Sequence, residues 1–111
     1  MFTVLYQDRK GGLQVQNRKT KKWHDIPFNK KGLVVNTGRA LEYLSKSKFK
    51  ATNHRVLWNK SKRLSAPFFF EPSYDFKMNR SYLNSKKYSN SGQIYEKFLN
   101  QSLKKFIEYQ R

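Results

Sequence analysis

Short apolar runs alternate with turn-forming residues over the first two-thirds of the chain, a pattern that predicts β-strands. Six strands are expected, at residues 2–7, 13–17, 21–27, 33–36, 49–58 and 63–70. The run LVVN at 33–36 is continuously apolar, which is typical of a strand buried on both faces. Pro67 cannot donate a hydrogen bond to a neighbouring strand, so the last strand is expected at a sheet edge or at a bulge.

Two segments have the features of helices. Residues 39–44, RALEYL, are good helix formers. Residues 92–110 carry apolar side chains at helical spacing, namely Ile94, Phe98, Leu99, Leu103, Phe106 and Ile107. This amphipathic segment is expected to pack on the sheet, although a membrane-surface helix or a partner-binding helix has the same pattern. Mainly β structure with closely spaced strands predicts an antiparallel barrel or jelly roll.

The composition allows one small folded domain and excludes cysteine chemistry. The 111 residues include nine Phe, seven Tyr and two Trp, which is enough apolar surface for a core. Because the chain has no cysteine, disulfides, thiolate metal sites and cysteine nucleophiles are excluded. The first residues lack the apolar run of a signal peptide or a membrane span, so a cytoplasmic protein without a membrane partner is expected.

Net charge is the most unusual bulk property. Twenty-four Lys and Arg against seven acidic residues give +17, which attracts polyanions without sequence specificity. The basic residues are scattered and match no recognised nucleic-acid motif, so no specific nucleic-acid partner is expected. Two interpretations stay open: a functional polyanion-binding surface, and a solvated lysine-rich surface without a partner.

Residues 54–65, HRVLWNKSKRLS, contain the candidate chemistry. His54 is one of two histidines, and an imidazole can bind a metal ion. Arg63 and Ser65 are two residues apart, so on a strand their side chains point to the same side. A guanidinium can bind a carboxylate through two parallel hydrogen bonds, and a hydroxyl can add a third. Taken alone, these residues are more simply interpreted as an ordinary strand histidine and a chance pair.

The order of the motifs is more informative than any single one. The landmarks are FTVLYQD (2–8), GGLQVQ (11–16), WHDIP (23–27), GLVVNTG (32–38), LEYLS (41–45), FKATNHRV (49–56) and RLSAPFFFEP (63–72). In this order and spacing they resemble the C-terminal half of the catalytic domain of iron(II)- and 2-oxoglutarate-dependent dioxygenases, in the isopenicillin N synthase-like branch. The resemblance covers residues 1–72 closely. Residues 73–111 are interpreted as an irregular segment and a closing helix that packs on the barrel.

The resemblance implies a partial double-stranded β-helix, which is a form of jelly roll, with Fe(II) and 2-oxoglutarate as cofactor and co-substrate. His54 matches the distal histidine that binds iron in the family. Arg63 and Ser65 match the R-x-S pair that binds the far carboxylate of 2-oxoglutarate. Of the three phenylalanines at 68–70, at least two are expected in the core, and one is a candidate for the substrate site.

The His-x-Asp motif that provides the family's other two iron ligands is not found in this sequence. His24 is followed by Asp25, but the spacing is wrong and the pair lies in the WHDIP landmark. The expectation is therefore a fragment of a dioxygenase for a small organic substrate, inactive by itself. Two alternatives are a catalytically dead remnant that binds polyanions and a module that binds a partner protein through residues 92–110. The sequence carries no expectation about oligomeric state.

Overall fold

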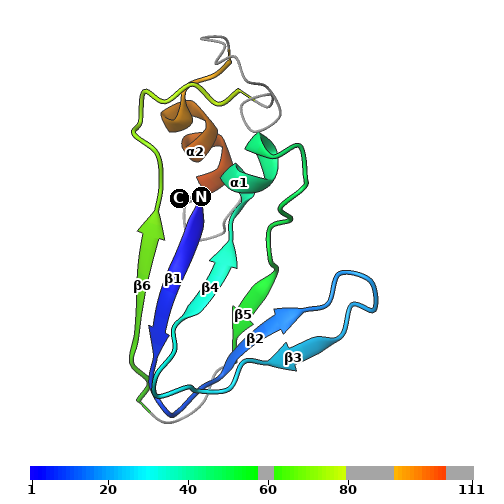
Figure 1. The fold of residues 1–111 in the computed structure, drawn as a ribbon, viewed down its shortest axis with the longest axis vertical. Helices are drawn as coiled ribbons and strands as arrows, with labels where there is room; N and C mark the ends of the chain where they lie inside the picture. Colours follow the sequence, from blue (N-terminus) through cyan, green and yellow to red (C-terminus); the bar gives the residue numbers. More distant parts are fainter. Residues whose placement is uncertain (58–61, 80–91, 105–111) are drawn as a thin grey trace.

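The computed structural model describes residues 1–57, 62–79 and 92–104 (Figure 1). Its strands are β1 (Phe2–Gln7), β2 (Leu13–Gln16), β3 (Trp23–Asp25), β4 (Val34–Thr37), β5 (His54–Val56) and β6 (Ser65–Phe70), and its helices are α1 (Arg39–Leu44) and α2 (Tyr95–Leu103). The order of expected elements is confirmed, although several strands are shorter than the apolar runs that predicted them. None of the helices in these ranges is both long enough and apolar enough to cross a membrane.

The strands form two antiparallel sheets of three strands each, ordered β4–β1–β6 and β3–β2–β5. Neighbouring strands come from distant parts of the chain, as in the jelly-roll architecture that the sequence predicted. β1 pairs with β6 over its whole length, which places Gln7 opposite Ser65. In the second sheet, Val15 of β2 lies between His24 of β3 and His54 of β5.

β6 is an edge strand, as its proline predicted, and Pro67 lies opposite Leu5 in an unbroken register. The prediction that residues 33–36 are buried on both faces was wrong. Val35 is 63% exposed because it lies on the same sheet face as Phe68, and none of the described elements covers these two side chains. The predicted core packing of residues 68–70 was also wrong, since all three phenylalanines are at least 49% exposed.

Residues 49–53 were expected in a strand but lie outside one, because α1 binds their backbone. The Glu42 carboxylate accepts a hydrogen bond from the Ala51 amide (3.1 Å), and the Ser45 hydroxyl accepts one from the Phe49 amide (3.0 Å). These bonds hold the segment against the end of α1. Strand pairing starts only afterwards, at β5.

The hydrophobic core lies where the two helices meet. Its buried residues are Ala40 and Leu44 of α1, Met78, and Tyr95 of α2, with Met1, Tyr43, Phe76, Phe98 and Leu99 partly buried around them. Figure 1 shows both helices together at the end of the first sheet where β1 begins. α2 therefore packs mainly on α1 and the segment at 76–78. Phe106 and Ile107, which were predicted for the same apolar face, lie outside the described residues.

Candidate functional site

The turn between β1 and β2 connects the elements that carry the candidate residues. Gly11 and Gly12 have φ angles of +62° and +87°, which glycine adopts without a Cβ clash. The Gly11 carbonyl accepts a hydrogen bond from Arg63 Nε (2.7 Å), and the Gly12 carbonyl accepts one from the Leu57 amide (2.8 Å). The pair Gly11 and Gly12 thus holds the end of β5 and the approach to β6.

Arg63 is held at two of its three guanidinium nitrogens. Besides the bond from Nε to Gly11, its Nη1 donates to the Ser65 hydroxyl oxygen (2.8 Å). The third nitrogen, Nη2, is buried and has no hydrogen-bond partner among the residues that the structure describes. Leaving a buried donor unpaired costs about 1–3 kcal/mol, and more for a charged group. Nη2 is therefore suited to an acceptor from a ligand, and a carboxylate is the best match for a guanidinium.

Ser65 lies on the same side as Arg63, as the two-residue spacing predicted, and the two side chains are in contact. Because the Ser65 oxygen accepts from Arg63, its own hydroxyl hydrogen can be donated to a ligand. Asp8 positions the residue between them. Its carboxylate accepts from the Leu64 amide (2.8 Å), and its amide donates to the Leu64 carbonyl (3.0 Å).

Gln7 is a buried polar residue of this region that sequence reasoning missed. It lies opposite Ser65 and is 5% exposed. Its Nε2 donates to the carbonyls of Ile26 (3.1 Å) and Pro27 (3.4 Å), which follow β3 and so link the two sheets. Its Oε1 is buried, with no hydrogen-bond partner in the part of the chain that the structure describes. The alternation of β1 puts Gln7 on the same face as Leu5, but no sequence pattern predicts its contacts with Ile26 and Pro27.

His54 is the first residue of β5, and its side chain is exposed. Its Nδ1 lies 2.9 Å from the Thr52 carbonyl oxygen. A carbonyl only accepts hydrogen bonds, so Nδ1 carries the proton and Nε2 has the lone pair that can bind a metal. His54 thus fits an iron site as one ligand.

The structure brings Arg63 and Ser65 together but places His54 on the other sheet. His24 shares its face with His54, with Val15 between them. Within 1–57, 62–79 and 92–104, no group of three or more His, Asp or Glu residues could hold a metal ion. The described part of the chain therefore holds Arg63 and Ser65 in contact and contains no cluster of three or more potential metal ligands.

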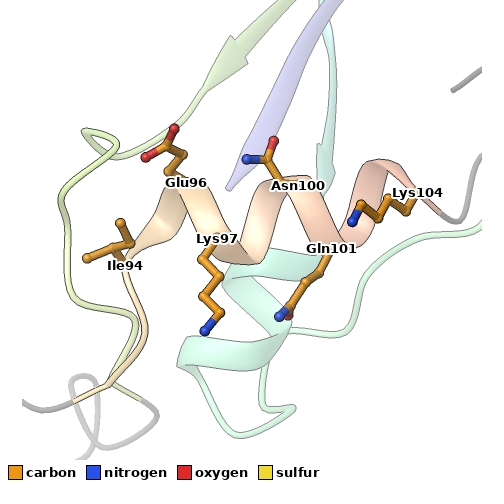
Figure 2. Close-up of a pocket in the computed structure, with 6 residues that line it drawn as sticks. All are labelled: Ile94, Glu96, Lys97, Asn100, Gln101 and Lys104. Carbon is orange, nitrogen blue, oxygen red and sulfur yellow. The ribbon is translucent and has the colours of Figure 1, made fainter.

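A pocket of about 340 Å³ lies elsewhere, along α2 (Figure 2). It is lined by Ile94, Glu96, Lys97, Asn100, Gln101 and Lys104. All of these residues come from one helix and its immediate ends, and none of them belongs to the candidate site.

Comparison with known proteins decides the family. The family model described as 2OG-Fe(II) oxygenase superfamily matches residues 1–72. The chain belongs to this superfamily. Fe(II) and 2-oxoglutarate are therefore the cofactor and co-substrate that its family implies.

Among curated proteins, this oxygenase-family chain is similar to plant and fungal enzymes. It is 41% identical over 72 residues to feruloyl CoA ortho-hydroxylase 2 of Arabidopsis thaliana, covering 64% of the chain and 20% of that protein. It is 36% identical over 78 residues to the 2-oxoglutarate-dependent dioxygenase citB of Monascus ruber, covering 69% of the chain and 24% of that protein. The chain thus spans a fifth to a quarter of the length of these relatives.

Solved structures confirm the fold of this oxygenase-family chain. A full-length Neurospora crassa protein in complex with alpha-KG is similar with a TM-score of 0.73 and 28% identity, over 92% of the chain and 34% of that protein. JOX2 in complex with 2OG, Fe and JA is similar with a TM-score of 0.60 and 34% identity, over 67% of the chain and 22% of JOX2.

Proposed function

We propose that the chain provides the 2-oxoglutarate side of a dioxygenase site, with Arg63 and Ser65 binding the distal carboxylate. The proposal rests on Nη2 of Arg63, which is buried and has no hydrogen-bond partner among the described residues. Since Nε and Nη1 are already held, the guanidinium is oriented before a ligand arrives, which lowers the entropic cost of binding. One carboxylate can accept from Nη2 and from the Ser65 hydroxyl.

When bound, 2-oxoglutarate supplies the electrons for oxygen activation at Fe(II), leaving as succinate and CO₂ while a small organic substrate is oxidised. The chain's own residues bind and orient. Arg63 and Ser65 hold the end of the co-substrate that does not react. His54 offers Nε2 to the metal, and the Thr52 carbonyl keeps the required proton on Nδ1.

We further propose that His54 is an iron ligand and that residues 1–57, 62–79 and 92–104 do not complete the iron site by themselves. The family's metal class uses two histidines and a carboxylate, and the described residues contain no such group. The chain alone, supplied with Fe(II) and oxygen, is therefore expected to form no succinate from 2-oxoglutarate. Succinate formation that Arg63→Ala abolishes would overturn this part of the proposal.

The carboxylate-binding role is tested by titrating 2-oxoglutarate into the chain and two variants by calorimetry. Arg63→Ala is expected to weaken binding about 10- to 160-fold, because the charge-assisted hydrogen bond from Nη2 contributes about 1.5–3 kcal/mol. Arg39→Ala removes the same charge from an exposed position at the start of α1 and is expected to leave affinity unchanged. Equal affinity in the native chain and Arg63→Ala would contradict the role assigned to Arg63.

A further inference from the structure

The turn between β2 and β3 has the highest local concentration of positive charge in the chain. Residues 17–22, NRKTKK, contain four basic residues and no acidic one. We call these six residues the basic turn. All four basic side chains, Arg18, Lys19, Lys21 and Lys22, are exposed.

The backbone of the basic turn is held by its first residue. The Asn17 side-chain oxygen accepts hydrogen bonds from the amides of Lys19 (2.9 Å) and Thr20 (3.0 Å). The Asn17 carbonyl accepts from the Lys21 amide (2.9 Å), and the Asn17 amide donates to the Lys22 carbonyl (2.8 Å). The charges are thus carried on an ordered hairpin, which lowers the entropic cost of binding through them.

Little of this charge is neutralised within the chain. Arg18 approaches Glu42 of α1 at 3.5 Å, with half of its own side chain exposed. Lys19, Lys21 and Lys22 form no ion pair with any residue that the structure describes. Asp25, at the base of the same hairpin, accepts a hydrogen bond from Gln14 instead (2.8 Å). The turn therefore presents a positive potential to solvent.

We propose that the basic turn binds the phosphate backbone of duplex DNA without sequence preference. The DNA major groove is about 12 Å wide and admits a two-stranded β-ribbon, whereas the major groove of duplex RNA is too narrow for side chains to enter. Figure 1 shows the β2–β3 hairpin extending from the side of the molecule, where such a ribbon could reach a groove.

The composition of the basic turn disfavours two other polyanions. Single-stranded nucleic acid is typically bound by aromatic side chains that stack on bases, and the turn has none. The nearest aromatic residue, Trp23, is half-buried, and the Arg55 guanidinium lies 4.2 Å from its ring centre. Binding to a bilayer surface is strengthened by apolar side chains that insert, and the turn also lacks these.

The test measures binding of the chain to a fluorescent DNA duplex between 50 and 200 mM salt. One variant replaces the three free lysines of the basic turn by glutamine, and a control variant makes the same three changes at other exposed positions. The first is Lys19→Gln, Lys21→Gln and Lys22→Gln, and the control is Lys30→Gln, Lys31→Gln and Lys48→Gln. Arg18 is kept in both, so its contact with Glu42 is preserved.

The basic-turn variant is expected to lose about 2.7 units of the salt slope, at about 0.9 per phosphate contact, while the control keeps the native slope. Over this fourfold range of salt, the native affinity then falls about 40-fold more than that of the variant. Equal slopes in the two variants, or no binding to the duplex at 50 mM salt, would overturn the proposal. Tighter binding to a single strand, an RNA duplex or anionic phosphatidylserine vesicles would also overturn it.

Discussion

At the scale of residues, two buried polar atoms have no hydrogen-bond partner among the residues that the structure describes, Nη2 of Arg63 and Oε1 of Gln7. Arg63 and Ser65 were predicted from the resemblance to the family, and their chemical types and spacing fit a carboxylate ligand. The sequence could not predict Gln7 in the same way. Gln7 links the two sheets through its hydrogen bonds to Ile26 and Pro27, which follow β3. No spacing along the chain predicts these contacts.

Replacing Gln7 by Leu is expected to lower the free energy of unfolding by about 1–3 kcal/mol, because the carbonyls of Ile26 and Pro27 lose their buried donor. Gln16→Leu is the matched control, since the Gln16 side chain bonds at an exposed position, and it is expected to change stability by about 0.5 kcal/mol or less. Urea unfolding followed by circular dichroism measures both. A Gln7→Leu variant as stable as Gln16→Leu would contradict the proposed link between the sheets.

At the scale of elements, the sequence predicted the order of strands and helices better than their ends or their neighbours. Apolar periodicity identifies a strand, but it does not show that Glu42 and Ser45 bind the backbone of residues 49–53. Because of these bonds, β5 begins only at His54. Apolar periodicity likewise identifies the apolar face of α2 without showing that this face packs on α1 and the segment at 76–78. Both failures concern contacts between elements.

Tyr95 anchors α2 and makes its packing depend on pH. Burial raises the pKa of the Tyr95 phenol above its usual range. The hydrogen bond that Tyr95 donates to Glu71 (2.6 Å) raises this pKa further. The folded chain therefore holds this proton more tightly than the unfolded chain, in which tyrosine titrates near about pH 10. The contribution to stability is complete below about pH 10 and is lost as the pH rises above it.

Tyr95→Phe is expected to remove this dependence. Because phenylalanine cannot ionise, the stability of the variant should fall less steeply above about pH 10 than that of the native chain. Urea unfolding of both proteins over a series of alkaline pH values gives the two slopes. Identical slopes would show that Tyr95 is not the group responsible.

At the scale of the whole molecule, one face of the β4–β1–β6 sheet is apolar and exposed. The register places Val4, Val35 and Phe68 side by side on this face, with Tyr6 and Phe70 beside them. Phe68 is 65% exposed and Val35 is 63% exposed. An apolar pattern predicts that a side chain prefers burial, but it does not show which element covers it. This is why burial was predicted wrongly here while the strands were predicted correctly.

The exposed face is expected to make the chain self-associate as its concentration rises. Phe68→Lys places a charge in the middle of this face and should shift the sedimentation profile toward the monomer. Phe69→Lys is the control, because Phe69 is equally exposed but points to the opposite face of the same strand. If both variants sediment alike, this face does not drive association.

We expect Arg63 to recognise the distal carboxylate of 2-oxoglutarate. The most direct measurement compares the binding of 2-oxoglutarate with that of 2-oxobutyrate, which keeps the oxo acid but lacks the second carboxylate. Binding of 2-oxoglutarate about 10- to 160-fold tighter is expected, since only this ligand pairs the buried Nη2 of Arg63. Equal affinity for the two oxo acids would show that Arg63 does not recognise the distal carboxylate.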